Sequence, residues 1–291
     1  MHNTINFFSE GSKIAGHLYL PNSETAISPA IILCQGFAGV KELLLPAFAR
    51  YFSERGYAVL CFDYRGFGES EGERGRLVPE YQIRDIQNAI TYLQSREDID
   101  REKIGLWGSS FGGANAIVTA ARDRRVKCLC VQLTFGDGER VITGAMSPEE
   151  KSKFLDTIFK MQQKKVTTNK ELMVSIHKVL TDEQSKAFYN EKVASFPALE
   201  IKIPFLTVAE TMGHKPESFL DDLNIPIHIV SADHDGVNPP LESQTLYEKA
   251  HEPKAHLVVE GASHYEVYEG EYFELVANAQ IEWFGRYLGV R

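Results

Sequence analysis

The chain alternates between two patterns of hydrophobic and polar residues. Short apolar runs that end in a glycine, such as "AIILCQG" from Ala30 and "YAVLCFDYRG" from Tyr57, have the length and composition of buried strands. Segments between them, such as "PEYQIRDIQNAITYLQSR" from Pro79, place apolar residues at helical spacing. Such strands alternating with amphipathic helices predict a mainly parallel sheet with helices on both faces.

The same patterns predict further elements along the chain. "NTINFFSEGSKIAGHLYLP" alternates and turns at Glu10-Gly11, which predicts an N-terminal β-hairpin. Helices are predicted in "LLLPAFARYFSERG", in "FGGANAIVTAAR" and in "YFELVANAQIEWFGRYL", which closes the chain. Further buried strands are predicted in "KIGLWGSS" from Lys103, "VKCLCVQLTF" from Val126, "IPIHIVSA" from Ile225 and "AHLVVEGASH" from Ala255.

Between Gly136 and Leu223 the rhythm changes from alternating strands and helices to a helical pattern. In "SPEEKSKFLDTIFKMQQKK", a serine, a proline and a glutamate three residues after the serine predict a capping box with proline at the first helical position. "TDEQSKAFYNEKV" repeats the device with Thr181 and Gln184. The first of these capping boxes is formed by Ser147, Pro148 and Glu150.

This helical segment is too long to be a plain loop in a compact domain. It is either a stabilising excursion or a cap over a site, and we prefer the cap because ligand sites in such sheets lie at the carboxyl ends of the strands. The predicted organisation is therefore a core made of residues 1–135 and 224–291, with a helical cap insertion at 136–223.

Composition narrows the class of protein. With 291 residues, 43% of them hydrophobic, the chain can bury the core of one large domain with an insertion. Its net charge of −9 argues against nucleic acid or an anionic membrane surface as the main partner. No apolar run reaches the ~18 residues of a membrane span, and the start "MHNTINFFSEGSK" lacks the features of a secretory signal. We therefore expect a soluble, cytoplasmic protein.

The four cysteines lie in or beside apolar, strand-like runs, and their spacing matches no zinc site. We expect them to be reduced and to pack as small core residues. No metal or organic cofactor is predicted, and the sequence does not indicate an oligomeric state. The cysteines are Cys34, Cys61, Cys128 and Cys130.

The stretch "LWGSSFGG" carries the first candidate chemistry. Residues Gly108 to Gly112 fit G-x-S-x-G with Ser110 at the centre, after a predicted strand and before a predicted helix. A nucleophile on such a sharp turn has a strained backbone, and glycines remove collisions with the strand and helix behind it. We predict that Ser110 is the nucleophile and that Ser109 is used for packing or backbone hydrogen bonding. The alternative is a glycine-rich turn with a structural serine.

A serine nucleophile needs a base and an orienting acid. His264 follows the last predicted strand and is the preferred base, while His234 is the one serious rival. The acid lies in "VSADHDGVNPP", which offers Asp233 and Asp235. We prefer Asp235 because Gly236 follows it and allows the chain to bend toward the histidine, with Asp233 as a turn-forming residue.

Two backbone N–H groups are candidates for the oxyanion hole. The N–H of Phe111, at the start of the helix after Ser110, points to where an oxyanion forms. The second donor is expected in "CQGFAGVKE", where Gly36 lets the backbone approach closely and Phe37 carries the N–H. The alternative is that Gly36 merely ends a strand.

These residues together resemble the α/β-hydrolase superfamily over nearly the whole chain, through "QGFAG", "FDYRGFGES", "GSSFGG", "SADHDGVNP" and "GASH". Within it, the chain is similar to the dienelactone-hydrolase-like and serine-peptidase-like esterase branch. The resemblance implies an α/β-hydrolase fold with an eight-stranded, mostly parallel sheet and a helical cap. It carries the catalytic triad onto Ser110, Asp235 and His264. Many members have a histidine where this chain has Gln35.

The expected function is a serine hydrolase of carboxylesterase type that cleaves an ester, thioester or activated amide of a small-molecule acyl substrate. An acyltransferase or a carbon–carbon bond hydrolase would use the same triad, and a non-catalytic binding protein is the alternative of another class. Apolar stretches of the insertion, "FLDTIFKM" and "IPFLTVAETM", could line a substrate pocket. We prefer to assign them to the packing faces of the cap helices.

Overall fold

A single sheet organises the protein, whose computed structural model describes residues 2–22 and 27–289. Its eight strands have the order β1-β2-β4-β3-β5-β6-β9-β10, in which β1 and β2 run antiparallel to their neighbours and all other pairs are parallel. This confirms the predicted eight-stranded, mostly parallel sheet. The strands are β1 (Asn3–Ser9), β2 (Ser12–Tyr19), β3 (Ser28–Cys34), β4 (Ala58–Phe62), β5 (Ile99–Ser109), β6 (Val126–Gln132), β9 (Ile227–Ala232) and β10 (Lys254–Val259).

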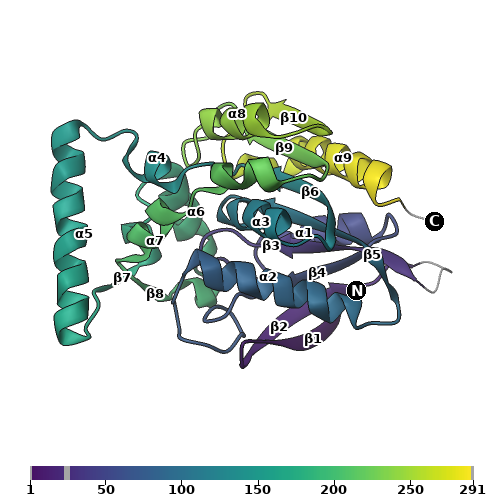
Figure 1. The fold of residues 1–291 in the computed structure, drawn as a ribbon, viewed down its shortest axis with the longest axis horizontal. Helices are drawn as coiled ribbons and strands as arrows, with labels where there is room; N and C mark the ends of the chain where they lie inside the picture. The colour runs from purple at the N-terminus through teal and green to yellow at the C-terminus, as the bar shows by residue number, and fades with distance from the viewer. Residues whose placement is uncertain (1, 23–26, 290–291) are drawn as a thin grey trace.

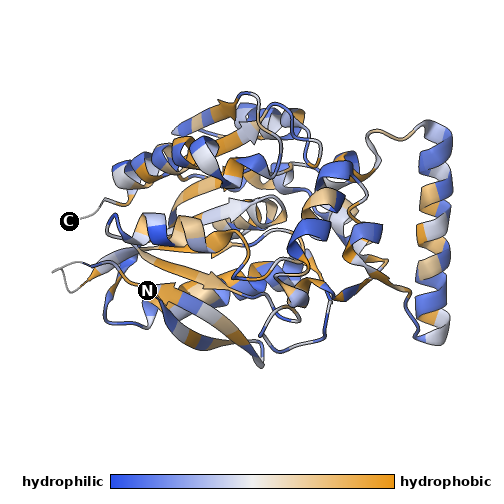
Figure 2. Ribbon diagram, turned by 180° about the vertical axis from the view of Figure 1, so that it is seen from behind, coloured by the Kyte–Doolittle hydropathy of each residue, from blue (hydrophilic) through white to orange (hydrophobic). Residues whose placement is uncertain are grey.

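Helices cover both faces of the sheet (Figure 1) because its central strands are apolar on both sides. In β3, for example, Ile32 packs into the hydrophobic cluster on one face and Ile31 into the cluster on the other. Figure 2 shows this as a hydrophobic centre enclosed by helices with hydrophilic outer surfaces. Helices α2 (Pro79–Gln94), α3 (Phe111–Arg122) and α8 (Pro240–Lys249) contribute to the first cluster, and α1 (Leu45–Ser53) and α9 (Gly270–Tyr287) to the second.

An inserted segment separates β6 from β9 and is mainly helical, as its sequence predicts. The short antiparallel pair β7-β8 within it was not predicted. Figure 1 shows α5 standing apart at one end of the molecule, with the other inserted elements between it and the sheet. These elements are α4 (Gly138–Thr143), α5 (Pro148–Thr168), β7 (Met173–Ser175), α6 (Glu183–Lys192), β8 (Lys202–Pro204) and α7 (Thr207–Gly213), with 3-10 turns at Ile176–Lys178, Pro197–Leu199 and Pro216–Asp222.

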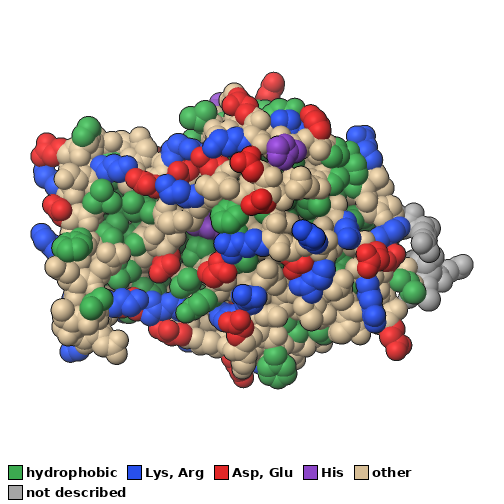
Figure 3. All heavy atoms as spheres, viewed as in Figure 1, with side chains coloured by type: hydrophobic (Ala, Val, Ile, Leu, Met, Phe, Trp, Pro, Cys, Tyr) green, Lys and Arg blue, Asp and Glu red, His purple; other side chains and the backbone are tan. Residues whose placement is uncertain are grey.

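Helix α5 begins as predicted, since Ser147 and Glu150 form a reciprocal capping box. Its packing against the rest of the molecule is sparse: Ile158 is its only buried residue, while Phe159 is 58% exposed. Figure 3 shows hydrophobic side chains at the surface on this side of the molecule. Within the described ranges, no helix combines the length and hydropathy needed to cross a bilayer.

The second predicted capping box is wrong. Helix α6 begins one residue later than expected, and the Asp182 side chain accepts the helix-capping hydrogen bond from Ser185 N. Asp and Thr both cap helices, and here Asp182 takes the place assigned to Thr181. Gln184, which the capping box would have used, is therefore free to make other contacts.

All four cysteines are free, fully buried and distributed over β3, β4 and β6, as expected for core residues. Burial raises the pKa of the Cys34 thiol to about 12 and also raises the pKa of the other three thiols. Because the thiolate is the reactive form, these side chains are both inaccessible and unreactive at neutral pH.

We predict that a thiol reagent such as dithionitrobenzoate modifies none of the cysteines of the native protein at pH 8 over minutes, and all four after denaturation. Release of thionitrobenzoate in the presence and absence of guanidinium chloride measures this. Stoichiometric reaction of even one thiol in the native protein would contradict the packing of these strands.

Candidate active site

Ser110 occupies the sharp turn between β5 and α3 at the carboxyl edge of the sheet. Its φ of +54° lies in the left-handed region, which costs a residue with a side chain about 1–3 kcal/mol. The turn is held by Ser110 N, which donates to Gln132 O on β6 at 2.9 Å, and by Thr134 Oγ1, which donates to Ser110 O at 2.7 Å. The strained backbone leaves the Ser110 side chain partly exposed in a hollow.

Two glycines are required by the close approach of the helix to the strands behind it. A Cβ at Gly112 would lie 2.1 Å from the carbonyl oxygen of Cys34 on β3. A Cβ at Gly108 would lie 2.5 Å from the carbonyl oxygen of Gly112. Both contacts involve backbone atoms that cannot move aside, so the spacing of glycines around Ser110 follows from packing.

A buried carboxylate and imidazole face each other across two loops at the same edge. His264, in the loop after β10, places Nδ1 2.7 Å from Oδ2 of Asp235, in the loop after β9. The other oxygen, Oδ1, accepts from the N–H groups of Val237 and Asn238, each at 2.8 Å. Because a carboxylate can only accept, Nδ1 carries the proton and Nε2 is left with a free lone pair.

The structure brings Asp235 to the histidine, whereas Asp233 has another partner. Asp233 is exposed and its Oδ1 accepts from Gly261 N at 2.8 Å, which ties the two loops together. His234 is also exposed and does not line the hollow around Ser110. Of the two aspartates and two histidines that the sequence offered, Asp235 and His264 form the buried pair.

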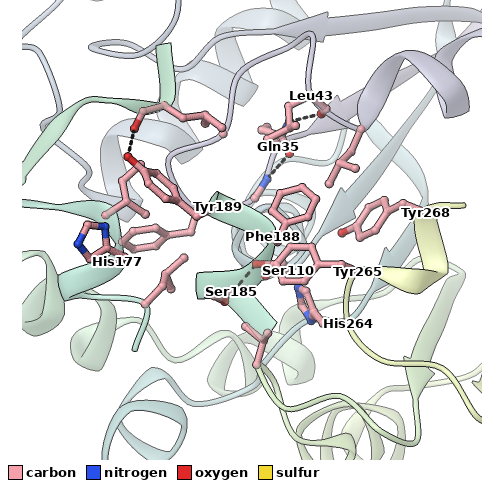
Figure 4. A pocket seen from close by; sticks show the side chains of 18 residues that line it. Gln35, Leu43, Ser110, His177, Ser185, Phe188, Tyr189, His264, Tyr265 and Tyr268 are labelled. Carbon is pink, nitrogen blue, oxygen red and sulfur yellow. Dashed lines mark hydrogen bonds between the residues drawn. The ribbon is translucent and has the colours of Figure 1, made fainter. Parts of the chain in front are cut away.

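Ser110 and His264 line the same cavity, in which Figure 4 shows their side chains close together. Within the described residues no hydrogen bond joins them, and Ser110 Oγ instead accepts from Nδ2 of Asn238 at 3.3 Å. Asn238 is buried, and the same amide donates to Leu133 O at 2.7 Å. No sequence pattern pointed to Asn238, because its contacts are with residues more than a hundred positions away.

The loop after β3 lies directly against the turn at Ser110. A Cβ at Gly36 would be 3.5 Å from the Cβ of Ser110, and the rings of Phe37 and Phe111 meet edge to face with centroids 5.5 Å apart. In the loops and turns that the structure describes, the N–H groups of Phe37 and Phe111 donate to no backbone carbonyl.

The side chain of Gln35 stabilises this loop through hydrogen bonds to its backbone. Its Nε2 donates to the carbonyl oxygens of Val40 at 2.8 Å and Leu43 at 2.6 Å, and its Oε1 accepts from Gly36 N at 2.8 Å. Figure 4 draws the bond to Leu43. The buried amide therefore satisfies three backbone groups of the loop. The residue that departs from the common pattern of the resembling family acts here as an internal brace.

A second brace is the buried Lys41. Its Nζ lies 2.9 Å from Asp63 Oδ2 and 2.6 Å from both Glu42 and Glu69, while its backbone N donates to Asp63 Oδ1 at 2.7 Å. Burial by itself lowers the pKa of Lys41, but these carboxylates outweigh it and raise that pKa. Lys41 thereby links the loop after β3 to the loop after β4 and carries a charge that is fully compensated.

Ser109 is buried and its hydroxyl hydrogen-bonds to the hydroxyl of Tyr268, in the 3-10 turn that follows His264. This is a side-chain partner, whereas packing or a backbone hydrogen bond was predicted. The two adjacent serines thus face different ways. Ser110 opens to the hollow, and Ser109 supports the segment that carries the histidine.

Two hollows meet at Ser110. The first has a volume of about 80 Å³ and lies between the loop after β3, the inserted segment and the histidine loop. The second, of about 850 Å³, lies toward α4 and α5 and opens to solvent. Phe37, Leu180, Val237 and Ser110 border both.

The first hollow is mostly apolar and aromatic, and the inserted segment supplies much of its wall. The stretches that the sequence singled out border the second hollow only in part, through Phe154, Phe205, Val208 and Thr211. Others among them, such as Phe159, point to solvent. From the inserted segment, the first hollow is lined by Ile176, His177, Leu180, Ser185, Phe188, Tyr189 and Leu199.

The part of the chain that the structure describes contains no group of three or more His, Cys, Asp or Glu side chains arranged to hold a metal ion.

Comparisons with known proteins agree with the observed fold. A family model described as alpha/beta hydrolase fold matches residues 29–271. An Escherichia coli protein described as an uncharacterized 31.7 kDa protein in the traX-finO intergenic region is 47% identical over 261 residues, covering 89% of this chain and 91% of that protein.

Two further similarities extend over nearly the whole chain. The thiohydrolase aneE of Aspergillus aculeatus is 32% identical over 292 residues, covering 94% of this chain and 89% of the relative. The solved structure of the DcsB complex with its substrate analogue superposes with a TM-score of 0.86 at 26% identity and covers 99% of both chains.

The brace at Gln35 leads to a testable prediction. Gln35→Ala leaves buried carbonyl groups without a partner, at about 1–3 kcal/mol each, and Gln35→Glu replaces their donor with an acceptor. We expect both variants to lower the free energy of unfolding and to reduce kcat/KM by about 10-fold or more. Denaturant unfolding and steady-state kinetics measure this, with the exposed Gln163→Ala on α5 as control. Wild-type behaviour of both variants would contradict the role of Gln35.

Proposed function

The chain belongs to the alpha/beta hydrolase fold family, and we propose that it is a serine hydrolase that cleaves esters, thioesters or activated amides through an acyl-serine intermediate. The observation that carries the proposal is the buried Asp235–His264 pair, which faces the same hollow as the strained Ser110. The similarity to the named thiohydrolase supports an enzyme of hydrolase type.

In the proposed mechanism, His264 Nε2 accepts the Ser110 proton as Oγ attacks the substrate carbonyl carbon. Asp235 keeps the imidazole in the tautomer with the proton on Nδ1 and stabilises the imidazolium that forms. His264 then protonates the leaving group. In the second half, His264 takes a proton from water, the resulting hydroxide attacks the acyl-enzyme, and Ser110 recovers its proton.

The negative charge that develops on the carbonyl oxygen needs fixed donors. We propose that the N–H groups of Phe37 and Phe111 supply them, since both border the elbow and neither donates to a backbone carbonyl in the described loops. Loss of one such donor costs about 3–4 kcal/mol of transition-state stabilisation.

Ser110 Oγ has to leave Asn238 Nδ2 and turn toward His264 before it can react. Rotation about a side-chain bond of a partly exposed serine is fast, and catalytic hydrogen bonds are often loose before substrate binds. The 3.3 Å contact with Asn238 is at the long end for a hydrogen bond, so its loss opposes this rotation only weakly.

The apolar lining of the first hollow indicates that it receives the acyl group of the substrate. Its wall includes Leu43, Ile176 and Leu199, whose side chains offer no charge to a polar ligand. A carboxylesterase or thioesterase acting on aliphatic or aromatic acyl groups fits this lining.

Acyl transfer is a second candidate function, favoured by the second hollow. Ser110 borders both spaces, so an acyl group in the first and an acceptor in the second could be present at once. Product analysis with an added alcohol or thiol distinguishes the two functions. Acyl transfer predicts a product ratio that saturates with acceptor concentration, whereas hydrolysis predicts the acid as the sole product.

The nucleophile can be tested directly. We expect Ser110→Ala to lower turnover of acyl esters by about a thousand-fold or more and to abolish labelling by a fluorophosphonate probe, because only an activated serine reacts. Ser109→Ala keeps the nucleophile and remains labelled. Circular dichroism checks that both variants are folded, and undiminished turnover by Ser110→Ala would refute the assignment.

The proposal that the first hollow receives the acyl group leads to a separate prediction. Leu199→Trp fills part of the first hollow, so we expect the ratio of kcat/KM for a long-chain to a short-chain p-nitrophenyl ester to fall about 10-fold. Leu275→Trp, at an exposed position on α9, is the matched control and should leave the ratio unchanged. An unaltered ratio in Leu199→Trp would place the acyl group elsewhere.

A further inference from the structure

We infer that Gln184, on α6 of the inserted segment, is a positioning residue that joins the acid and histidine loops; this inference rests on the proposed function. Its Nε2 donates to His234 O at 2.9 Å, and its Oε1 accepts from Gly236 N and from His264 N, each at 3.2 Å. One carboxamide thus binds the residues on both sides of Asp235 and the backbone of the histidine itself.

The arrangement requires the chemistry of an amide. The two backbone N–H groups need an acceptor and the carbonyl needs a donor, which a carboxamide supplies in one rigid plane. A glutamate would set a charged oxygen against His234 O, and an alanine would leave all three groups without this partner. The position is also sterically matched, since a Cβ at Gly236 would lie 3.1 Å from Gln184 Nε2.

Independent contacts fix α6 against the histidine loop. Ser185 Oγ lies 3.1 Å from Tyr265 OH, and the ring of Phe188 stacks on that of Tyr265 with centroids 4.0 Å apart and planes 8° from parallel. Figure 4 shows Ser185, Phe188 and Tyr265 gathered beside His264. Gln184 therefore belongs to a docked helical turn whose position relative to the two loops is set by its neighbours.

The same helix forms part of the wall of the first hollow, through Ser185, Phe188 and Tyr189. Substrate that fills this hollow touches α6 on one side while Gln184 on the same helix holds the acid and histidine loops. The inserted segment thus acts on catalysis as well as on binding: it aligns Asp235 with His264 when α6 is docked.

The groups that set the charge around His264 come from three elements. Asp235 on the acid loop hydrogen-bonds to the imidazole, Tyr265 packs on it with centroids 4.9 Å apart, and Asp182 at the start of α6 acts on the Tyr265 hydroxyl. Burial raises the pKa of Tyr265, so its hydroxyl stays neutral across the pH range of the kinetic measurements. Tyr265 therefore adds no titration of its own to the pH profile, and the carboxylates of Asp235 and Asp182 are present in the wild type and in every variant.

The experiment measures wild type, Gln184→Ala, Gln184→Glu and Lys186→Ala with a short-chain p-nitrophenyl ester across pH. Lys186 is exposed on the same helix and serves as the matched control. For Gln184→Ala we expect kcat to fall about 10- to 100-fold with KM changed less than about 2-fold, because alignment and not binding is lost. Lys186→Ala should retain wild-type kinetics.

The pH profile separates positioning from a structural role. In Gln184→Ala the acid limb of kcat/KM should move to lower pH, because a less constrained Asp235 stabilises the imidazolium less. In Gln184→Glu it should move to higher pH, because the added carboxylate stabilises the imidazolium. Glutamate is close to glutamine in size. If the alanine variant does not fold, the pH profile of Gln184→Glu therefore still tests the positioning role of Gln184.

Wild-type kcat and pH profile in both Gln184 variants would overturn the inference. So would a fall in kcat that accompanies a lowered unfolding temperature while the pH profile stays fixed. In both cases wild-type protein is still labelled at Ser110 by a fluorophosphonate. Failure of the proposed function is recognised separately, by wild-type protein that is not labelled at all.

Discussion

The contact between Asp235 and His264 is the interaction on which the site depends. It joins two loops that follow neighbouring parallel strands, β9 and β10, and it is buried together with the hydrogen bonds that saturate the carboxylate. A carboxylate taken out of water is costly unless it is paired and hydrogen-bonded, and Asp235 meets both conditions. Because the pair fixes which imidazole nitrogen carries the proton, the other nitrogen is left to face the hollow at Ser110.

The loops around this pair are held by side chains that act on backbone groups. Gln35 satisfies the loop after β3, Lys41 ties it to the loop after β4, and Gln184 joins the acid and histidine loops. Gln35 and Gln184 each contact the backbone beside a group that we propose touches substrate. Loops held in this way place hydrogen-bond donors and the base in position before the reaction begins. Such groups stabilise the charge of the transition state without a cost of rearrangement.

Much of the fold could be predicted from the sequence, because apolar runs of strand length and helices of regular period carry local signals. The turn at Ser110 was also accessible, since glycine spacing records the close approach of α3 to β3. Contacts between residues far apart in the sequence give no local signal. The contact of Asn238 with Ser110 and that of Gln184 with His264 depend on how the loops fold. The prediction of a capping box with Thr181 and Gln184 was wrong because Asp182 caps helix α6 instead. The domain boundaries and the cap function of residues 136–223 stay predictions.

The proposed function requires a covalent acyl group on Ser110 during turnover. The most direct test mixes the protein with an activated acyl ester, quenches in acid within the first turnovers and maps the added mass by peptide mass spectrometry. The account predicts one acyl group per chain, on the peptide that contains Ser110. Steady turnover with no acyl group on that peptide, or with the group on another residue, would contradict it.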